Sequence, residues 1–254
     1  MGPGAGGAGA TTCQVIDVAS SSYCNNLASY PLQVADASAG GVINGIPIIC
    51  GGRTSSGEVS ACYAHNRTLD AWELFVDLAV ARKRPASVLL NSGALWVTGG
   101  YKQGHSPSSY LTSTELIFPN GTLKSGPDLP EPKLGHCMTK MHDGRVMIVG
   151  TSYHNQEQTV RIFDPSTGMW TNGPNLLFKR LFAACATFKS PLHGGRSVVI
   201  AAGGSGQATA EIYDYTVAGK SWEQSKTFIF FRIMTKSMIF FNHFSCRPPN
   251  HTLY

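Results

Sequence analysis

The sequence predicts an all-β protein built from four repeated units, each with four short antiparallel strands. Apolar runs that end in glycine recur about every 50 residues, and tryptophans recur at a nearly fixed distance behind them. The composition agrees, because only 14% of the 254 residues are charged and 28 are glycine. Sparse charge with abundant glycine is typical of many short strands joined by tight turns.

Four apolar runs define the repeat. They end at Gly51-Gly52, Gly99-Gly100, Gly150-Thr151 and Gly203-Gly204, and the first glycines are 48, 51 and 53 residues apart. This period matches one four-stranded blade of a radially repeating all-β fold. We expect these glycines to be structural, because glycine lets backbones approach closely where inner strands crowd together.

Three tryptophans follow the glycines in step. Trp72, Trp170 and Trp222 lie 21, 20 and 19 residues after the first glycine of their units, while the second unit has Leu123 after its turn. Between glycine and tryptophan lies another apolar strand, which runs into a turn such as Asn120-Gly121 or the one over 164–168. Such residues favour hairpin turns. We expect each tryptophan to be buried against the neighbouring unit.

A further strand precedes each apolar run, over 84–90, 136–140 and 183–188, which completes four strands per unit. The units are then placed at about 41–80, 84–130, 134–178 and 182–225, within a repeat region over 12–225. Residues 1–11 are Gly/Ala-rich low complexity with no signal-peptide pattern. Residues 226–254 contain no further glycine pair and are expected to be a disordered or aberrant tail outside the repeats.

The paired glycines, the aromatic before an Asp-Pro-Ser-Thr-Gly turn and the spaced tryptophan resemble the Kelch motif. The fourth unit, with Gly203-Gly204, Tyr213-Asp214 and Trp222, fits it best. The resemblance implies a Kelch-type β-propeller with four recognisable blades and a partial one before them. Since Kelch propellers close with six or seven blades, we expect an incomplete propeller. The segment around Cys24 also resembles a cysteine-bearing subset of invertebrate extracellular Kelch proteins.

Seven cysteines and three sequons favour an extracellular over a cytoplasmic location. Cys50 ends one predicted strand and Cys62 begins its antiparallel neighbour, which predicts a disulfide between them. Cys137 and Cys185 occupy similar places in adjacent units, where they either face each other or fill the core. Asn66 and Asn120 are the candidate glycosylation sites, with Asn120 on an outer hairpin turn.

The charge gives no support for nucleic-acid binding. The formal net charge of +5 falls to +1 over residues 1–225, because the tail carries four basic residues and no acid. A membrane segment is not favoured either, since the apolar stretch over 228–244 is short and contains Arg232 and Lys236.

We expect no enzyme, catalytic residue, cofactor or metal. The glycines after Val198 lead into a strand where a dinucleotide site needs a helix. Gly219-Lys220-Ser221 ends like a phosphate-binding loop, but Asp214 stands where that motif needs glycine. No histidine or cysteine spacing matches a metal site.

The expected function is binding of a protein partner, because the family resemblance implies that the loops after the glycine pairs form one binding face. The candidate residues on these loops are Arg53, Tyr101, Lys102, His105, Tyr153, His154 and Gln207. Three alternatives stay open: the substrate-recognition part of a ubiquitin-ligase adaptor, a secreted adhesive or structural glycoprotein, and, less favoured, a propeller enzyme with a galactose-oxidase-like fold.

Overall fold

The computed structural model describes residues 11, 13, 16–17, 22–23, 27–36, 38–106, 108–150, 158–204 and 206–225. Their regular structure is almost entirely β, with one short 3₁₀ helix, η1 (Pro191–His193). Within these ranges no helix is long and apolar enough to cross a membrane.

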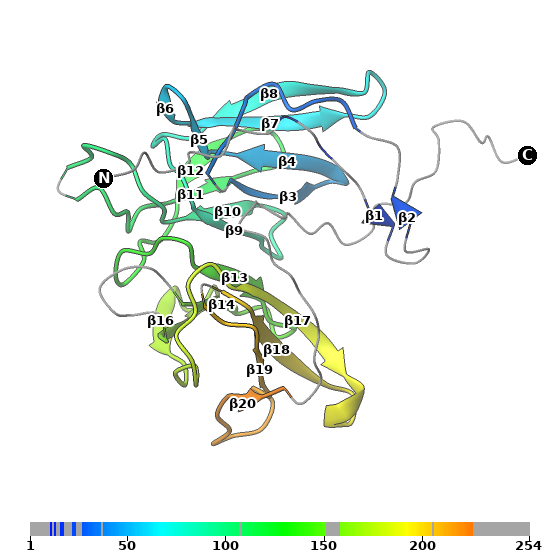
Figure 1. Ribbon diagram of the computed structural model, residues 1–254, viewed down its shortest axis with the longest axis vertical. Helices are drawn as coiled ribbons and strands as arrows, with labels where there is room; N and C mark the ends of the chain where they lie inside the picture. The colour runs from blue at the N-terminus through cyan, green and yellow to red at the C-terminus, as the bar shows by residue number, and fades with distance from the viewer. Residues whose placement is uncertain are drawn as a thin grey trace, which may run out of the picture.

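Four four-stranded antiparallel sheets follow one another along the chain (Figure 1). The first contains β3 (Ala39–Ile43), β4 (Ile46–Cys50), β7 (Ala61–Asn66) and β8 (Ala71–Asp77). The second contains β9 (Ala86–Leu89), β10 (Leu95–Thr98), β11 (Thr114–Ile117) and β12 (Leu123–Ser125). The third contains β13 (Cys137–Lys140), β14 (Val146–Val149), β15 (Val160–Asp164) and β16 (Met169–Asn172). The fourth contains β17 (Ala184–Ser190), β18 (Arg196–Ala202), β19 (Ala210–Tyr213) and β20 (Glu223–Gln224). Each sheet pairs its strands in chain order, which confirms the all-β prediction and the four-strand unit.

Two further strand pairs lie outside these sheets. One joins β1 (Ile16–Asp17) to β2 (Ser22–Tyr23). The other joins β5 (Arg53–Thr54) to β6 (Gly57–Glu58). The β5–β6 hairpin lies within the loop after the first glycine pair, where the sequence predicted only a loop.

The second strand of each unit is mostly apolar, and in the second unit both of its faces are covered. Along β10, Leu95 and Val97 join a core cluster with Ile48 and Cys50 of the first sheet. Trp96, between them, points to the opposite face and joins a cluster with residues of the third sheet, Phe163 among them. A strand between two sheets therefore reads as a continuous apolar run rather than an alternating one.

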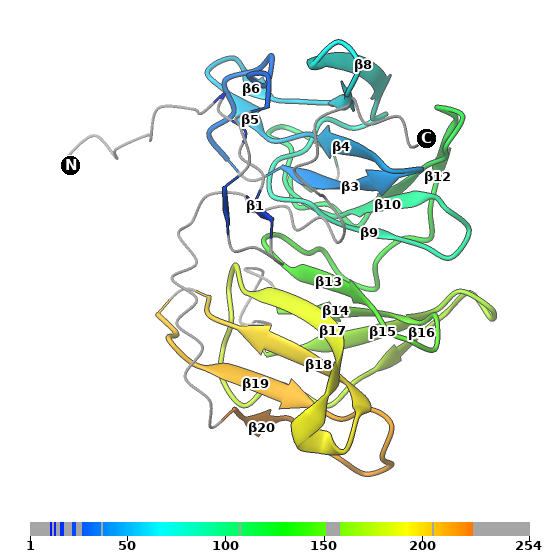
Figure 2. The same ribbon diagram turned by 90° about the vertical axis from the view of Figure 1, so that its right-hand side faces the viewer.

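The inner strands of successive sheets are joined directly. Ser87 Oγ on β9 donates to the Gly40 carbonyl on β3 at 2.7 Å, and the hydroxyls of Thr139 on β13 and Thr187 on β17 lie 3.0 Å apart. Figure 2 shows the sheets following one another from β3 to β20. This arrangement is compatible with a propeller-like fold, although no sheet of the described residues closes on itself.

Each predicted tryptophan ties its unit to the chain before it. The indole nitrogens of Trp72, Trp170 and Trp222 donate to the carbonyls of Ala28, Asp128 and Pro174 at 3.0, 2.9 and 2.9 Å. Trp170 of the third unit also lies against Trp96 of the second, with 5.9 Å between ring centroids. All three tryptophans therefore contact the segment before their unit, but only Trp222 is buried as expected, whereas Trp72 and Trp170 are half-buried.

The second glycine pair lies where the second unit closely approaches the segment that leads into the third. Gly99 has φ +58° and Gly100 has φ +97°. A Cβ at Gly99 would lie 2.5 Å from the Lys133 carbonyl of the next unit, and Gly100 N–H donates to that carbonyl at 2.7 Å. Only glycine combines this conformation with this proximity.

Candidate partner-binding face

The loops after the glycine pairs lie at the same end of the molecule as the segments that enter the inner strands. In an antiparallel sheet, the end of one strand and the start of its neighbour share an edge. Thus Lys83 and Tyr101 exchange backbone hydrogen bonds of 3.0 and 2.9 Å, although one precedes β9 and the other follows β10. We call this end the loop face.

Glu58 is the electrostatic centre of the loop face. Its side chain is only 4% exposed, and its carboxylate oxygens lie 3.7 Å from Lys83 Nζ and 3.8 Å from Lys102 Nζ. The carboxylate also accepts the Gln103 N–H at 3.4 Å. The β5–β6 hairpin of the first unit is thereby joined to the loop of the second unit.

Tyr101 packs between charged and aromatic neighbours on the same face. Lys83 Nζ lies 4.9 Å from the centroid of the Tyr101 ring, within the range of a cation–π contact. The Tyr110 ring meets the Tyr101 ring edge-on at 5.3 Å between centroids. These contacts hold a half-buried phenol beside two lysines.

Arg84 connects the first and fourth units across this end. Its guanidinium donates to Asp36 Oδ1 at 2.9 and 3.2 Å and lies 4.8 Å from the centroid of the Phe182 ring. Arg84 and Phe182 both adopt left-handed backbone conformations, as does Gly135 between them. A side chain at Gly135 would clash with the Phe182 ring, so this glycine leaves room for the arginine–phenylalanine contact.

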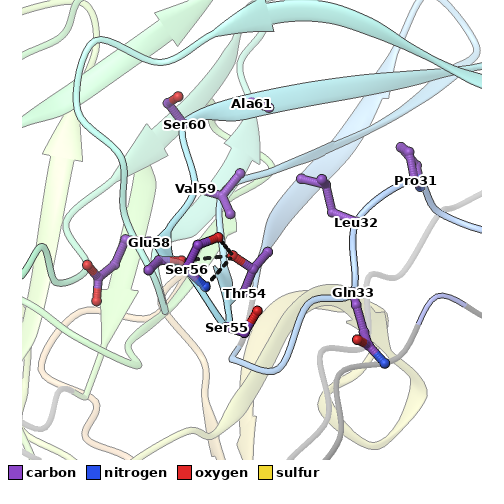
Figure 3. Close-up of a pocket in the computed structure, with 11 residues that line it drawn as sticks. Pro31, Leu32, Gln33, Thr54, Ser55, Ser56, Glu58, Val59, Ser60 and Ala61 are labelled. Atoms are coloured by element: carbon purple, nitrogen blue, oxygen red, sulfur yellow. Dashed lines mark hydrogen bonds between the residues drawn. The ribbon is translucent and has the colours of Figure 1, made fainter.

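A groove of about 470 Å³ borders Glu58 on the first unit (Figure 3). One wall is the segment with Pro31, Leu32 and Gln33, and the other is the stretch over 54–61. Hydroxyl groups from this stretch line the groove together with apolar side chains, and Thr54 Oγ1 lies 2.9 Å from Ser56 Oγ. A shallow groove of mixed polarity is suited to a segment of a partner rather than to an enclosed cofactor.

Buried arginines bind the backbone at the ends of the loops that form the loop face. Arg82 is fully buried, and its Nη1 donates to the carbonyls of Gly99 and Ser113 at 2.8 and 2.9 Å. Its Nη2 lies 2.6 Å from Glu115 Oε1. Burial lowers the pKa of Arg82, and the charge of Glu115 opposes this shift. Arg82 therefore fixes the ends of the loop that carries Tyr101.

The fourth unit repeats this arrangement, except that Nε rather than Nη2 of its arginine contacts the glutamate. Arg180 Nη1 donates to the carbonyls of Gly203 and Thr209, both at 2.7 Å. Its Nε lies 2.7 Å from Glu211 Oε1. In both units the glutamate also accepts two backbone N–H groups from the residues just before the arginine. The loop that carries Gln207 is held in the same way.

The structure places five of the seven predicted partner-binding residues. Tyr101 and Lys102 belong to the Glu58 cluster, and Arg53 is exposed and pairs with Glu58 across the β5–β6 hairpin. His105 is half-buried in the turn after Lys102, and Gln207 is half-buried on the separate loop of the fourth unit. Tyr153 and His154 lie outside the described residues.

The loop face also contains residues that the sequence reasoning missed. They are Asp36, Glu58, Lys83, Arg84, Tyr110 and Phe182. The basic run Arg82-Lys83-Arg84 before an inner strand was the available signal, because such a segment shares an edge with the loops after the glycine pairs.

Two cysteine pairs are placed at disulfide distance. Cys50 and Cys62 are direct cross-strand partners on β4 and β7, which confirms the predicted bond. Cys137 on β13 is bonded to Cys185 on β17, which decides between the two arrangements left open for this pair. The second bond joins the inner strands of adjacent units.

The fold and the loop face together define an all-β repeat protein with a charged, aromatic end. No protein-family model matches the chain, and no curated protein matches it. In the described part of the chain, no group of three or more His, Cys, Asp or Glu side chains is arranged to hold a metal ion.

Proposed function

We propose that the chain is a Kelch-type β-propeller module that binds a protein partner through the loop face. The observation that carries this proposal is the convergence of loops from separate units on one charged and aromatic surface around Glu58. Lys83, Arg84 and Lys102 form ion pairs there with the carboxylates of Asp36 and Glu58. Arg53 adds an exposed cation on the strand next to Glu58. Arginine and tyrosine are favoured anchors of protein interfaces.

Rigid support favours binding over a merely solvated surface. The loops rest on buried arginines whose hydrogen bonds fix the loop ends, so a partner does not have to order them. The adjoining groove adds apolar area from Leu32 and Val59. The two disulfides support an extracellular setting for this module, because such bonds persist in oxidising compartments.

The test is comparative affinity capture. The immobilised chain is used beside a face variant, Arg53→Glu with Lys102→Glu, and a control with the same charge change, Lys189→Glu with Lys220→Glu. The control residues are exposed and lie near the opposite end of the fourth unit. We expect a partner retained by the wild type and the control but lost from the face variant. Equal retention by both variants would contradict binding at the loop face.

A further inference from the structure

The β11–β12 hairpin carries a feature that partner binding does not use. Its turn contains the sequon Asn120-Gly121-Thr122, and an aromatic residue, Phe118, stands two positions before the asparagine. The hairpin extends from the outer side of the second sheet (Figure 2). Asn120 and Thr122 are both exposed, and Phe118 is half-buried.

The turn has a defined geometry. Gly121 N–H donates to the Phe118 carbonyl at 2.9 Å, and Phe118 N–H donates to the Thr122 carbonyl at 2.9 Å. Gly121 has φ +81°, so the loop is a tight turn followed by a left-handed bulge residue. Phe118 and Thr122 are therefore direct cross-strand partners whose side chains project from the same face of the hairpin.

Asn120 lies at the tip of this turn in a prearranged conformation. Its Oδ1 accepts the Thr122 N–H at 3.1 Å. Among the described residues no partner is found for its Nδ2, the atom that would carry a glycan. The turn thus presents an exposed acceptor nitrogen next to the sequon hydroxyl, with an aromatic ring on the flank.

We propose that Asn120 carries an N-linked glycan and that the Phe118 ring is the platform on which its first N-acetylglucosamine packs. The transfer forms a bond between Asn120 Nδ2 and C1 of the sugar and breaks the bond from C1 to a lipid pyrophosphate donor. The lipid pyrophosphate leaves, and one proton is lost from Nδ2. The C–H groups on one face of the sugar then lie on the apolar face of the ring.

In the structure, which carries no glycan, the Lys124 side chain contacts the Phe118 ring. Its Nζ lies 5.3 Å from the centroid of the Phe118 ring. The lysine is exposed, and such a contact is weak, so the lysine side chain can move into solvent when a sugar occupies the ring face.

Asn66 provides an internal comparison. Its sequon also lies on a hairpin turn, but its Nδ2 donates to Glu73 Oε2 at 3.3 Å, and its Oδ1 accepts two backbone N–H groups. Two positions before it stands Ala64, which offers no ring. A glycan at Asn66 would therefore lack the platform. The two disulfides support the secretory route that either modification requires, and the inference does not depend on partner binding at the loop face.

Occupancy is tested first, with the full chain secreted from eukaryotic cells behind a cleavable signal sequence. Enzymatic deglycosylation in ¹⁸O-labelled water, followed by peptide mass spectrometry, reports each asparagine. We expect most molecules to be modified at Asn120, the mobility shift of that glycan to disappear in Asn120→Gln, and Asn120 to remain occupied in Asn66→Gln. A secreted, disulfide-bonded chain with unmodified Asn120 would overturn the proposal.

The platform is tested by trimming the glycan to a single N-acetylglucosamine and measuring thermal unfolding. We expect the trimmed wild type to unfold about 2 °C or more above Asn120→Gln. The same comparison in a Phe118→Ala background should show no difference. An equal rise in both backgrounds overturns the platform, as does no rise in the wild type. If Phe118→Ala does not fold, Phe118→Leu keeps apolar bulk and removes only the flat ring, with the same outcomes.

Discussion

The second and fourth units hold a buried arginine–glutamate pair, whereas the third unit holds a lysine at the same place. Lys133 precedes β13 by as many residues as Arg82 precedes β9 and Arg180 precedes β17. Where the other units have Glu115 and Glu211, the third has Arg161. Lys133 Nζ instead lies 2.8 Å from Glu131 Oε1, and Arg161 Nε lies 3.2 Å from Glu131 Oε2.

The difference shows which part of the arrangement the repeat requires. All three units place a buried cation beneath the glycine turn, and Lys133 Nζ donates to Thr159 Oγ1 at 3.1 Å, the position of Ser113 and Thr209. The carboxylate that pairs with this cation comes from different places in the unit. It lies on β11 or β19 in the second and fourth units, and in the loop before β13 in the third. A lysine offers a point charge, however, whereas an arginine fork binds two carbonyls and a carboxylate at once.

The largest expected effect comes from breaking a complete pair. Arg180→Met leaves Glu211, which is fully buried, without its counter-ion, and removes the guanidinium hydrogen bonds to the carbonyls of Gly203 and Thr209. We expect a loss of about 3–5 kcal/mol in the free energy of unfolding, measured by urea denaturation with the disulfides intact. Adding Glu211→Leu should recover part of the loss, because the buried charge is then gone. A loss below about 1 kcal/mol would show that the pair is not a structural requirement.

An acid-sensitive group distinguishes the third unit. This group is His136, which occupies the position of Pro85 and Ala183 in the second and fourth units. The distance between His136 Nε2 and Thr98 Oγ1 is 2.8 Å. Burial, and then the charge of Lys133, lowers the pKa of His136 to about 3. In the unfolded chain the pKa is about 6.5, so the unfolded state binds more protons between these values. The stabilisation from neutral His136 is thus complete above pH 6.5 and is lost as the pH falls, by roughly 2–3 kcal/mol at pH 4.5.

The check is the slope of unfolding free energy against pH between 7 and 4.5, a window above the ordinary pKa of carboxylates. We expect His136→Gln to flatten this slope relative to the wild type. An unchanged slope would place the acid sensitivity elsewhere in the molecule.

A smaller effect is expected where the third unit departs from the pair. Lys133→Met leaves Glu131 paired with Arg161 and partly open to water, so no fully buried charge is stranded. We expect a loss of about 1–3 kcal/mol, measured in the same urea experiment, and smaller than that of Arg180→Met. If Lys133→Met and Arg180→Met lower the free energy of unfolding equally, the stranded charge of Glu211 adds nothing to the cost of losing the cation.

Local patterns in the sequence predicted much of the fold. The glycine pairs, the spaced tryptophans and the Asn120-Gly121 turn fix backbone conformations or cover neighbouring strands. Each of these roles requires particular residue types at nearby positions, so each is recognisable as a short sequence pattern. The Cys50–Cys62 bond was predictable for the same reason, because its cysteines lie on strands adjacent in the chain. Arg53, Tyr101 and Lys102 followed from the loops after the glycine pairs.

The missed part of the loop face depends on contacts between units. Glu58 meets Lys83 and Lys102 only because the β5–β6 hairpin of one unit reaches the loops of the next. Asp36, Arg84 and Phe182 meet across three units. No spacing within one repeat encodes these distances.

The sequence by itself determined the all-β class, the four-strand repeat and the places where glycine and tryptophan are needed, because these follow from backbone sterics and the apolar period. Only the tertiary structure decided that Cys137 faces Cys185, that buried cations support the glycine turns, and that Phe118 stands beside Asn120 across a tight turn. Those outcomes depend on how segments distant in the chain or opposed in a hairpin are brought together, and packing sets that geometry.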